Sequence, residues 1–288
     1  MTLHLVRGSG LIILLVLCTF YPFFSGEYDA LATPLSGMAQ VLGVLGLLFV
    51  PVGVLWLIYE LRKRARAKSN LSTKARGYYF ALASMVVFSL IAVAVSFGAF
   101  LSLGLSFGFL TLALCFYVAS RLTPGLKSLK RAEGEGFNYV PLYLVFVPCM
   151  VLIFQLALAP RATNFSRNRA IAQSAELIGD IEKYHAEHGR YPASLLALHK
   201  DYKPSVVGIE QFHYAPNGEA YNLFFEQPTF LLDFGIREIV MYNKLDEHLM
   251  VSHAAWILTA APEQLAARQG WHTSHDASSQ HWKYIWFD

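Results

Sequence analysis

Five long apolar blocks lie in the first 159 residues of this chain, and none lies in the 129 residues that follow. A helix needs about 20 apolar residues to cross the hydrocarbon core of a bilayer. The pattern therefore predicts an all-α transmembrane bundle over residues 1–159 and a soluble domain over residues 160–288. The expected spans are residues 9–24, 35–59, 78–98, 100–119 and 139–159. The third and fourth form one apolar stretch, which we divide near Gly98.

Basic residues between the blocks orient the predicted bundle. Segments 60–77 and 120–138 carry seven and four Lys or Arg, whereas the segment after the first block carries Glu27 and Asp29 and no Lys or Arg. The positive-inside rule places both basic segments in the cytoplasm. We therefore expect a cytoplasmic N-terminus, five crossings and a C-terminal domain in the periplasm, in the inner membrane of a Gram-negative cell.

The first block also has features of a signal peptide. Arg7 precedes the apolar residues 11–18, but the apolar run continues to Phe24 and no A-x-A cleavage site follows. We expect a retained span, and a cleaved signal peptide is the alternative.

Charge narrows the range of functions. Residues 1–159 contain 12 Lys and Arg against 5 Asp and Glu, whereas residues 160–288 contain 11 against 15. An acidic soluble domain argues against nucleic-acid binding. The interiors of the spans hold no Asp, Glu, Lys, Arg or His, which argues against a transporter or pump. The expected partners are membrane lipid and a protein of the envelope, and no cofactor is expected.

The soluble domain begins with a helix. We expect Pro160 to end the fifth span and an amphipathic helix to run from residue 164 to 188, with Gly189 as its C-terminal cap. A short helix at 193–199 follows. Asn217-Gly218 predicts a hairpin between residues 212–214 and 221–225. Further elements are expected at the following positions: strands at 236–242 and 282–287, and a helix at 262–268. The simplest fold class is α+β, a long N-terminal helix packed on a small antiparallel sheet.

One stretch of this domain resembles a known family. It contains Gly189, Tyr191-Pro192, Leu195 and Leu198, coming directly off the helix that holds Tyr184. This pattern resembles the segment after the long helix in major pseudopilins of type II secretion and related type IV pilins. The resemblance covers residues 164–226 and implies a pilin-like domain.

The chain departs from the pilin pattern before its fifth block. Gly136-Phe137 resembles a pilin cleavage site, but Pro141 stands where pilins carry a glutamate, and four apolar blocks lie upstream. Pro160 is also expected to interrupt the stem. We therefore expect a pilin-like domain fused to a membrane bundle rather than a filament subunit. The metal ligands of the family match no residues here.

Two groups of residues have the composition of binding sites. Glu182, His185 and His188 have the spacing of metal ligands on a helix, although histidines near a helix C-terminus also interact with its dipole. The polar, aromatic C-terminal segment is the candidate site for a sugar or peptide, and the alternative for its tryptophans is core packing. Its candidate residues are Trp271, His272, His275, Asp276, His281 and Trp282.

The leading hypothesis is a non-catalytic protein whose periplasmic domain binds a partner protein or envelope ligand, in anchoring, scaffolding or sensing. One alternative is a periplasmic enzyme or metal-binding protein that uses the His/Trp-rich segment. A second is an accessory subunit of a secretion or pilus machine, by analogy of fold. The charged residues His213, Asp233, Arg237 and Glu238 fall on or beside predicted strands, where cross-strand pairing accounts for them.

Overall fold

The computed structural model describes residues 2–67, 77–103, 105, 108–113, 115–117, 119–120, 137–217, 219–233, 236–248 and 272–287. The chain divides into two compact units. The first consists of Met1–Ile13 and Leu42–Ile153, and the second of Leu14–Val41 and Phe154–Asp288. The domain boundary predicted at residues 159–160 stays a prediction.

Within the described ranges, four helical segments are long and apolar enough to cross a membrane: Leu3–Phe23, Ala32–Arg66, Gly77–Phe97 and Val140–His188. The prediction of a multi-pass membrane protein in contact with lipid is therefore confirmed. These segments contain α1 (Thr2–Phe20), η1 (Tyr21–Phe23), α2 (Ala32–Gly46), η2 (Leu47–Phe49), α3 (Val50–Ala67), α4 (Gly77–Leu103) and α6 (Val140–His188). Within the fourth predicted span there is a shorter apolar helix, Gly108–Tyr117.

Glycines allow close helix packing in the first unit. A Cβ atom on Gly46 would lie 2.9 Å from Pro148 Cβ, and one on Gly53 would lie 2.8 Å from Val145 Cγ2. A Cβ atom added to Gly108 would lie 2.8 Å from the Cβ atom of Phe100. Such contacts are typical of membrane helices, where small residues let backbones approach.

Helix α6 continues through Pro160, so the prediction that this proline ends the helix is wrong. All 49 residues from Val140 to His188 are helical. An interior proline removes one helical hydrogen bond and costs about 3 kcal/mol. The apolar segment before Pro160 and the packed segment after it both favour the helix, and together they offset this cost. Gly189 ends α6 with a φ of +67° as predicted, and its N–H donates to His185 O at 2.8 Å.

The C-terminal part forms a five-stranded antiparallel sheet with the order β1-β2-β3-β5-β4. Its strands are β1 (His213–Asn217), β2 (Ala220–Gln227), β3 (Arg237–Asn243), β4 (His272–Asp276) and β5 (Trp282–Phe287). The hairpin predicted around Asn217 is confirmed by the pairing of Asn217 with Ala220. β4 was not expected, because its sequence HTSHD lacks apolar alternation. The helix predicted at 262–268 lies outside the described residues.

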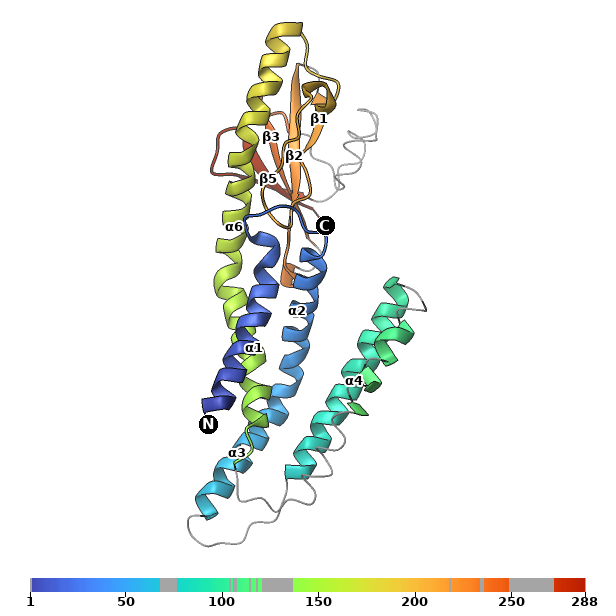
Figure 1. The fold of residues 1–288 in the computed structure, drawn as a ribbon, viewed down its shortest axis with the longest axis vertical. Helices are drawn as coiled ribbons and strands as arrows, with labels where there is room; N and C mark the ends of the chain where they lie inside the picture. The colour runs from blue at the N-terminus through green and yellow to red at the C-terminus, as the bar shows by residue number, and fades with distance from the viewer. Residues whose placement is uncertain are drawn as a thin grey trace. The chain divides into compact units, whose positions relative to one another are not determined.

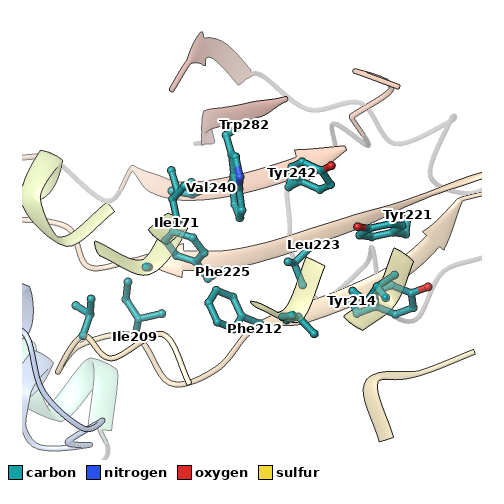
Figure 2. Packing of buried hydrophobic residues seen from close by; sticks show 14 residues of the cluster. Ile171, Ile209, Phe212, Tyr214, Tyr221, Leu223, Phe225, Val240, Tyr242 and Trp282 are labelled. Carbon is teal, nitrogen blue, oxygen red and sulfur yellow. The ribbon is translucent and has the colours of Figure 1, made fainter. Parts of the chain in front are cut away.

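One face of the sheet packs against the C-terminal part of α6 (Figure 1). Figure 2 shows Ile171 of α6 beside Phe225, Val240 and Trp282 from three strands. The helix supplies residues at helical spacing, Ala170, Ile171, Leu177 and Ile181, and each is buried. The opposite face is also covered, since Phe224, Ile239, Met241 and Ile285 are at most 1% exposed. This core fixes the sheet on the helix.

Main-chain hydrogen bonds join segment 22–29, which connects α1 to α2, with segment 205–208, which precedes β1. We call these two segments the clamp. Ser25 and Val206 form an isolated antiparallel bridge within it. Four bonds of 2.8 to 3.2 Å connect the segments, from the N–H groups of Gly26, Asp29, Val207 and Gly208 to the carbonyls of Ser205, Val207, Phe24 and Pro22, respectively. The clamp therefore places the α1–α2 connection against the sheet domain.

A second contact lies beside the clamp, where η4 (Leu231–Asp233) follows β2. Phe230 stacks on Phe23 with ring centroids 4.5 Å apart and meets Phe20 edge-on. Gln40 Oε1 accepts hydrogen bonds from Leu231 N at 2.7 Å and Gln155 Nε2 at 3.0 Å. Both glutamines are buried. Polar and aromatic groups thus tie the sheet domain to α1, α2 and α6 within the second unit.

Candidate functional site

The candidate site lies where β3, β5 and β4 face α6. Arg167, on α6, donates to Glu238 Oε1 from Nε at 2.9 Å and from Nη2 at 2.7 Å. Its Nη1 donates to Asn164 Oδ1 at 2.9 Å. The Arg167 and Glu238 side chains are 8% and 5% exposed. Because a buried charge is costly unless it is paired, this ion pair forms a fixed polar centre for the site.

Two aromatic residues of β5 cover the ion pair. Trp286 Nε1 donates to Glu238 Oε2 at 2.8 Å, so both oxygens of this carboxylate accept hydrogen bonds. The Arg167 guanidinium lies 3.8 Å from the centre of the Tyr284 ring, in a cation–π contact. The rings of β5 are therefore held in place by the charges beneath them.

His275 and Thr273, on β4, complete the site. The His275 ring stacks on the Tyr284 ring, with centroids 5.0 Å apart, and packs at a tilt against the Trp286 ring, with centroids 4.6 Å apart. Thr273 lies opposite Trp286 in the strand register. His275 Nε2 and Thr273 Oγ1 are both buried, and neither has a hydrogen-bond partner in the part of the chain that the structure describes. Since buried polar atoms are normally paired, these two are the groups that remain available to a bound molecule.

This arrangement offers hydrogen-bonding atoms to a bound molecule. A catalytic hydroxyl needs a base within hydrogen-bond reach to remove its proton. Thr273 Oγ1 and His275 Nε2 do not bond each other, and Glu238 is already occupied by Arg167 and Trp286. The free atoms can donate or accept hydrogen bonds, next to aromatic surface.

The predicted ligand residues that the structure describes have different surroundings. His272 begins β4, and Asp276 ends it with an exposed side chain. Trp282 is 4% exposed and belongs to the core with Tyr242, as in the core-packing alternative. His281 lies in the hairpin turn, where its Nδ1 is 3.1 Å from Asp246 Oδ2. Of the predicted residues, His275 lies at the centre of the site, and Trp271 lies outside the described residues.

The predicted metal ligands are each engaged elsewhere. Glu182 accepts hydrogen bonds from Lys244 Nζ at 2.7 Å and Tyr221 Oη at 3.5 Å, and the Lys244 contact raises the pKa of that lysine. His185 stacks on Tyr191, while His188 stacks on Tyr184 and contacts its carbonyl. Among the described residues, no group of three His, Cys, Asp or Glu side chains has the arrangement of a metal site.

Neither Arg167 nor Thr273 was predicted from the sequence as a site residue. The pairing of Glu238 with Arg167 was not predicted either. Glu238 was assigned to cross-strand pairing, which Arg237 does show through its bonds to Glu226. A signal for Arg167 was present: it falls on the helix stripe that Ala170, Ser174 and Ile181 continue inside the core. An arginine at a core position of an amphipathic helix requires a buried acidic partner.

Comparisons with known proteins identify no relative. No family model matches the chain, and no curated protein or solved structure shows significant similarity to it. The resemblance of residues 164–226 to pseudopilins therefore stays a prediction.

Proposed function

We propose that this chain is a five-span bacterial inner-membrane protein whose periplasmic domain binds a partner protein of the envelope, with the bundle as its anchor. The observation that carries the proposal is the clamp. Four main-chain bonds fix the domain against the α1–α2 connection, and Gln40 and Phe230 add side-chain contacts. A binding domain fixed in this way presents its surface at a constant position above the membrane.

The clamp also bears on the number of crossings. In the proposed topology segment 22–29 follows one crossing, and the main-chain bonds of the clamp support its lying on the same side of the membrane as the sheet domain. An even number of crossings must therefore separate the two. The helical segments Ala32–Arg66, Gly77–Phe97 and Val140–His188 supply three. The apolar stretch of residues 100–119, which includes the helix Gly108–Tyr117, is the natural fourth, and this supports five crossings in all.

The orientation rests on charge. Arg64 and Arg66 end α3, in the basic segment that joins two spans. The positive-inside rule puts this segment in the cytoplasm and the clamp on the opposite side. The binding domain then faces the periplasm.

A second candidate is a pilin-like accessory subunit of a secretion or pilus machine. The specific observation in its favour is the continuity of α6 through Pro160, which gives one helix with an apolar N-terminal half and a C-terminal half packed on a sheet. This is an analogy of fold, and it names neither a machine nor a partner.

The test is isolation of the intact protein in mild detergent after gentle crosslinking in cells, with mass spectrometry of what accompanies it. We expect one envelope protein in constant ratio to the chain. The matched variants are Gly208→Ala, which opens the clamp, and Gly179→Ala, where an added Cβ meets nothing within 4 Å. The partner should be lost from the first and kept by the second. A chain that is isolated alone under all crosslinking conditions would contradict the proposal.

A further inference from the structure

We propose that the outer edge of β4 binds an extended segment of the partner protein, which joins the sheet as a further strand and bonds Thr273 and His275 through polar side chains. The inference rests on the proposed function, since it names the surface and the chemistry by which the domain binds its partner. It is carried by the main-chain geometry of β4 and by the unpaired atoms on its face.

Among the described residues β4 pairs with β5 alone, and its main-chain groups point alternately to β5 and to its outer edge. β4 pairs with β5, and Asp276 lies opposite Lys283. Ala277 N donates to Trp282 O at 2.9 Å, so this next pair is a hydrogen-bonded one. Hydrogen-bonded and non-bonded pairs alternate in an antiparallel ladder. The main-chain groups of Thr273 and His275 therefore face β5, and those of Ser274 and Asp276 point outward.

The side chains of β4 alternate in the same way. Ser274 and Asp276 are exposed, whereas Thr273 and His275 lie against the aromatic residues of β5. Within β4, Thr273 Oγ1 and His275 Nε2 are buried and have no hydrogen-bond partner among the described residues. Leaving such an atom unpaired costs about 1 to 3 kcal/mol. A strand added beside β4 would place its own side chains directly next to these atoms on the same face.

The opposite edge of the sheet is less suited to a partner. Pro216 lies within β1 and provides no N–H, and prolines in edge strands protect against pairing with another chain. Tyr214, also in β1, already donates its hydroxyl to Pro192 O at 2.9 Å. β4 contains no proline, and its outward main-chain groups come from Ser274 and Asp276.

The partner segment is defined by this chemistry. Affinity comes from main-chain hydrogen bonds at the edge, and specificity comes from every second side chain. The residues that face Thr273 and His275 should carry hydroxyl, amide or carboxylate groups, because these can pair with the free Oγ1 and Nε2 atoms. The segment is extended and carries polar groups at alternating positions.

The test selects binders from a displayed library of linear peptides, with the full-length protein in mild detergent as the target. The peptides are about ten residues long, which is the upper length of common strands. The affinity of the selected peptides is then measured for two variants at position 274. Ser274→Pro removes an outward N–H, and Ser274→Ala keeps it. We expect Ser274→Pro to weaken binding about tenfold, the loss from one strong hydrogen bond, and Ser274→Ala to leave binding unchanged. Thermal unfolding of both variants checks that β4 remains folded.

A second pair of variants tests the side chains. Thr273→Val and His275→Phe keep the shape of the face and remove its polar atoms, so peptides with polar residues at alternating positions should lose affinity. A library that yields no binders, or binders that respond equally to Ser274→Pro and Ser274→Ala, would overturn the inference. If the envelope partner still accompanies Ser274→Pro at full yield, the proposed function stands and the β4 surface is wrong. If peptides bind at β4 but no partner accompanies the intact protein, the proposed function fails instead.

Discussion

Arg167 and Glu238 form a buried ion pair that joins α6 to β3, with a shortest N–O distance of 2.7 Å. Trp286 and Tyr284 enclose it, so the pair also holds the aromatic surface beside His275. The geometry of the candidate site therefore depends on two buried, oppositely charged side chains.

Removing one charge of this pair should be costly. Glu238→Gln leaves the Arg167 guanidinium buried without a counter-charge, and we expect the free energy of unfolding to fall by about 3 kcal/mol. The matched control is Glu226→Gln, because Glu226 pairs with Arg237 where both side chains are exposed, and such pairs contribute under about 1 kcal/mol. Equilibrium unfolding followed by tryptophan fluorescence measures both. Equal losses would show that the pair is not buried.

The clamp should not tolerate a side chain at Gly208. An added Cβ would lie 2.6 Å from Pro22 Cβ and 2.8 Å from Pro22 O, and the latter is backbone that cannot rotate away. We expect Gly208→Ala to destabilise the protein by about 1 to 3 kcal/mol and to expose segment 205–208 to protease. Gly179→Ala, in α6, should instead stabilise by about 0.5 to 1 kcal/mol. Unchanged protease resistance in Gly208→Ala would argue against the clamp.

Gln40 should matter more than its position in an apolar helix suggests. Gln40→Leu leaves the Leu231 amide and the Gln155 side chain without their acceptor, at a cost of about 1 to 3 kcal/mol. Met38→Leu, two residues away and exposed, should change stability by less than about 0.5 kcal/mol. Thermal unfolding in detergent compares the two. A neutral Gln40→Leu variant would mean that this network does not hold the domain.

His213 should make the stability of the domain depend on pH. Burial lowers its pKa below the ordinary value of 6.5, because the charged form is poorly solvated beside Phe224. The unfolded chain then binds the proton more readily than the folded one, so stability is fully present above pH 6.5 and falls as the pH drops below it. His213→Gln should flatten this slope below about pH 6.5. Parallel slopes would refute the assignment.

Local signals allowed much of the sheet domain to be predicted. Asn217-Gly218 indicated the hairpin, Gly189 indicated the end of α6, and strand 282–287 was predicted within its observed bounds. Each of these depends on neighbouring residues, through turn chemistry, capping or alternation. Long apolar helices followed by an antiparallel sheet could be expected for the same reason, although five spans were predicted and four long apolar helices lie within the described residues.

Contacts between distant segments could not be predicted. Pro160 carries a strong local signal to end a helix, but the packing of α6 overrides it. The strand His272–Asp276 has no apolar pattern, because its place in the sheet comes from pairing with β5. The clamp joins residues about 180 positions apart through main-chain hydrogen bonds. Since every residue other than proline has the same main-chain donor and acceptor, the sequence does not indicate these bonds. The orphan atoms of Thr273 and His275 become visible only with the register.

Cysteine labelling in intact cells tests most directly whether the α1–α2 connection and the sheet domain lie together on the periplasmic side. Cys18, Cys115 and Cys149 are first replaced by serine. Single cysteines are then placed at three exposed positions, Tyr28, Ser278 and Arg64. A membrane-impermeant maleimide should label Tyr28→Cys and Ser278→Cys in intact cells, and Arg64→Cys after permeabilisation. Different labelling of Tyr28→Cys and Ser278→Cys would contradict the clamp, and labelling of Arg64→Cys alone would reverse the orientation.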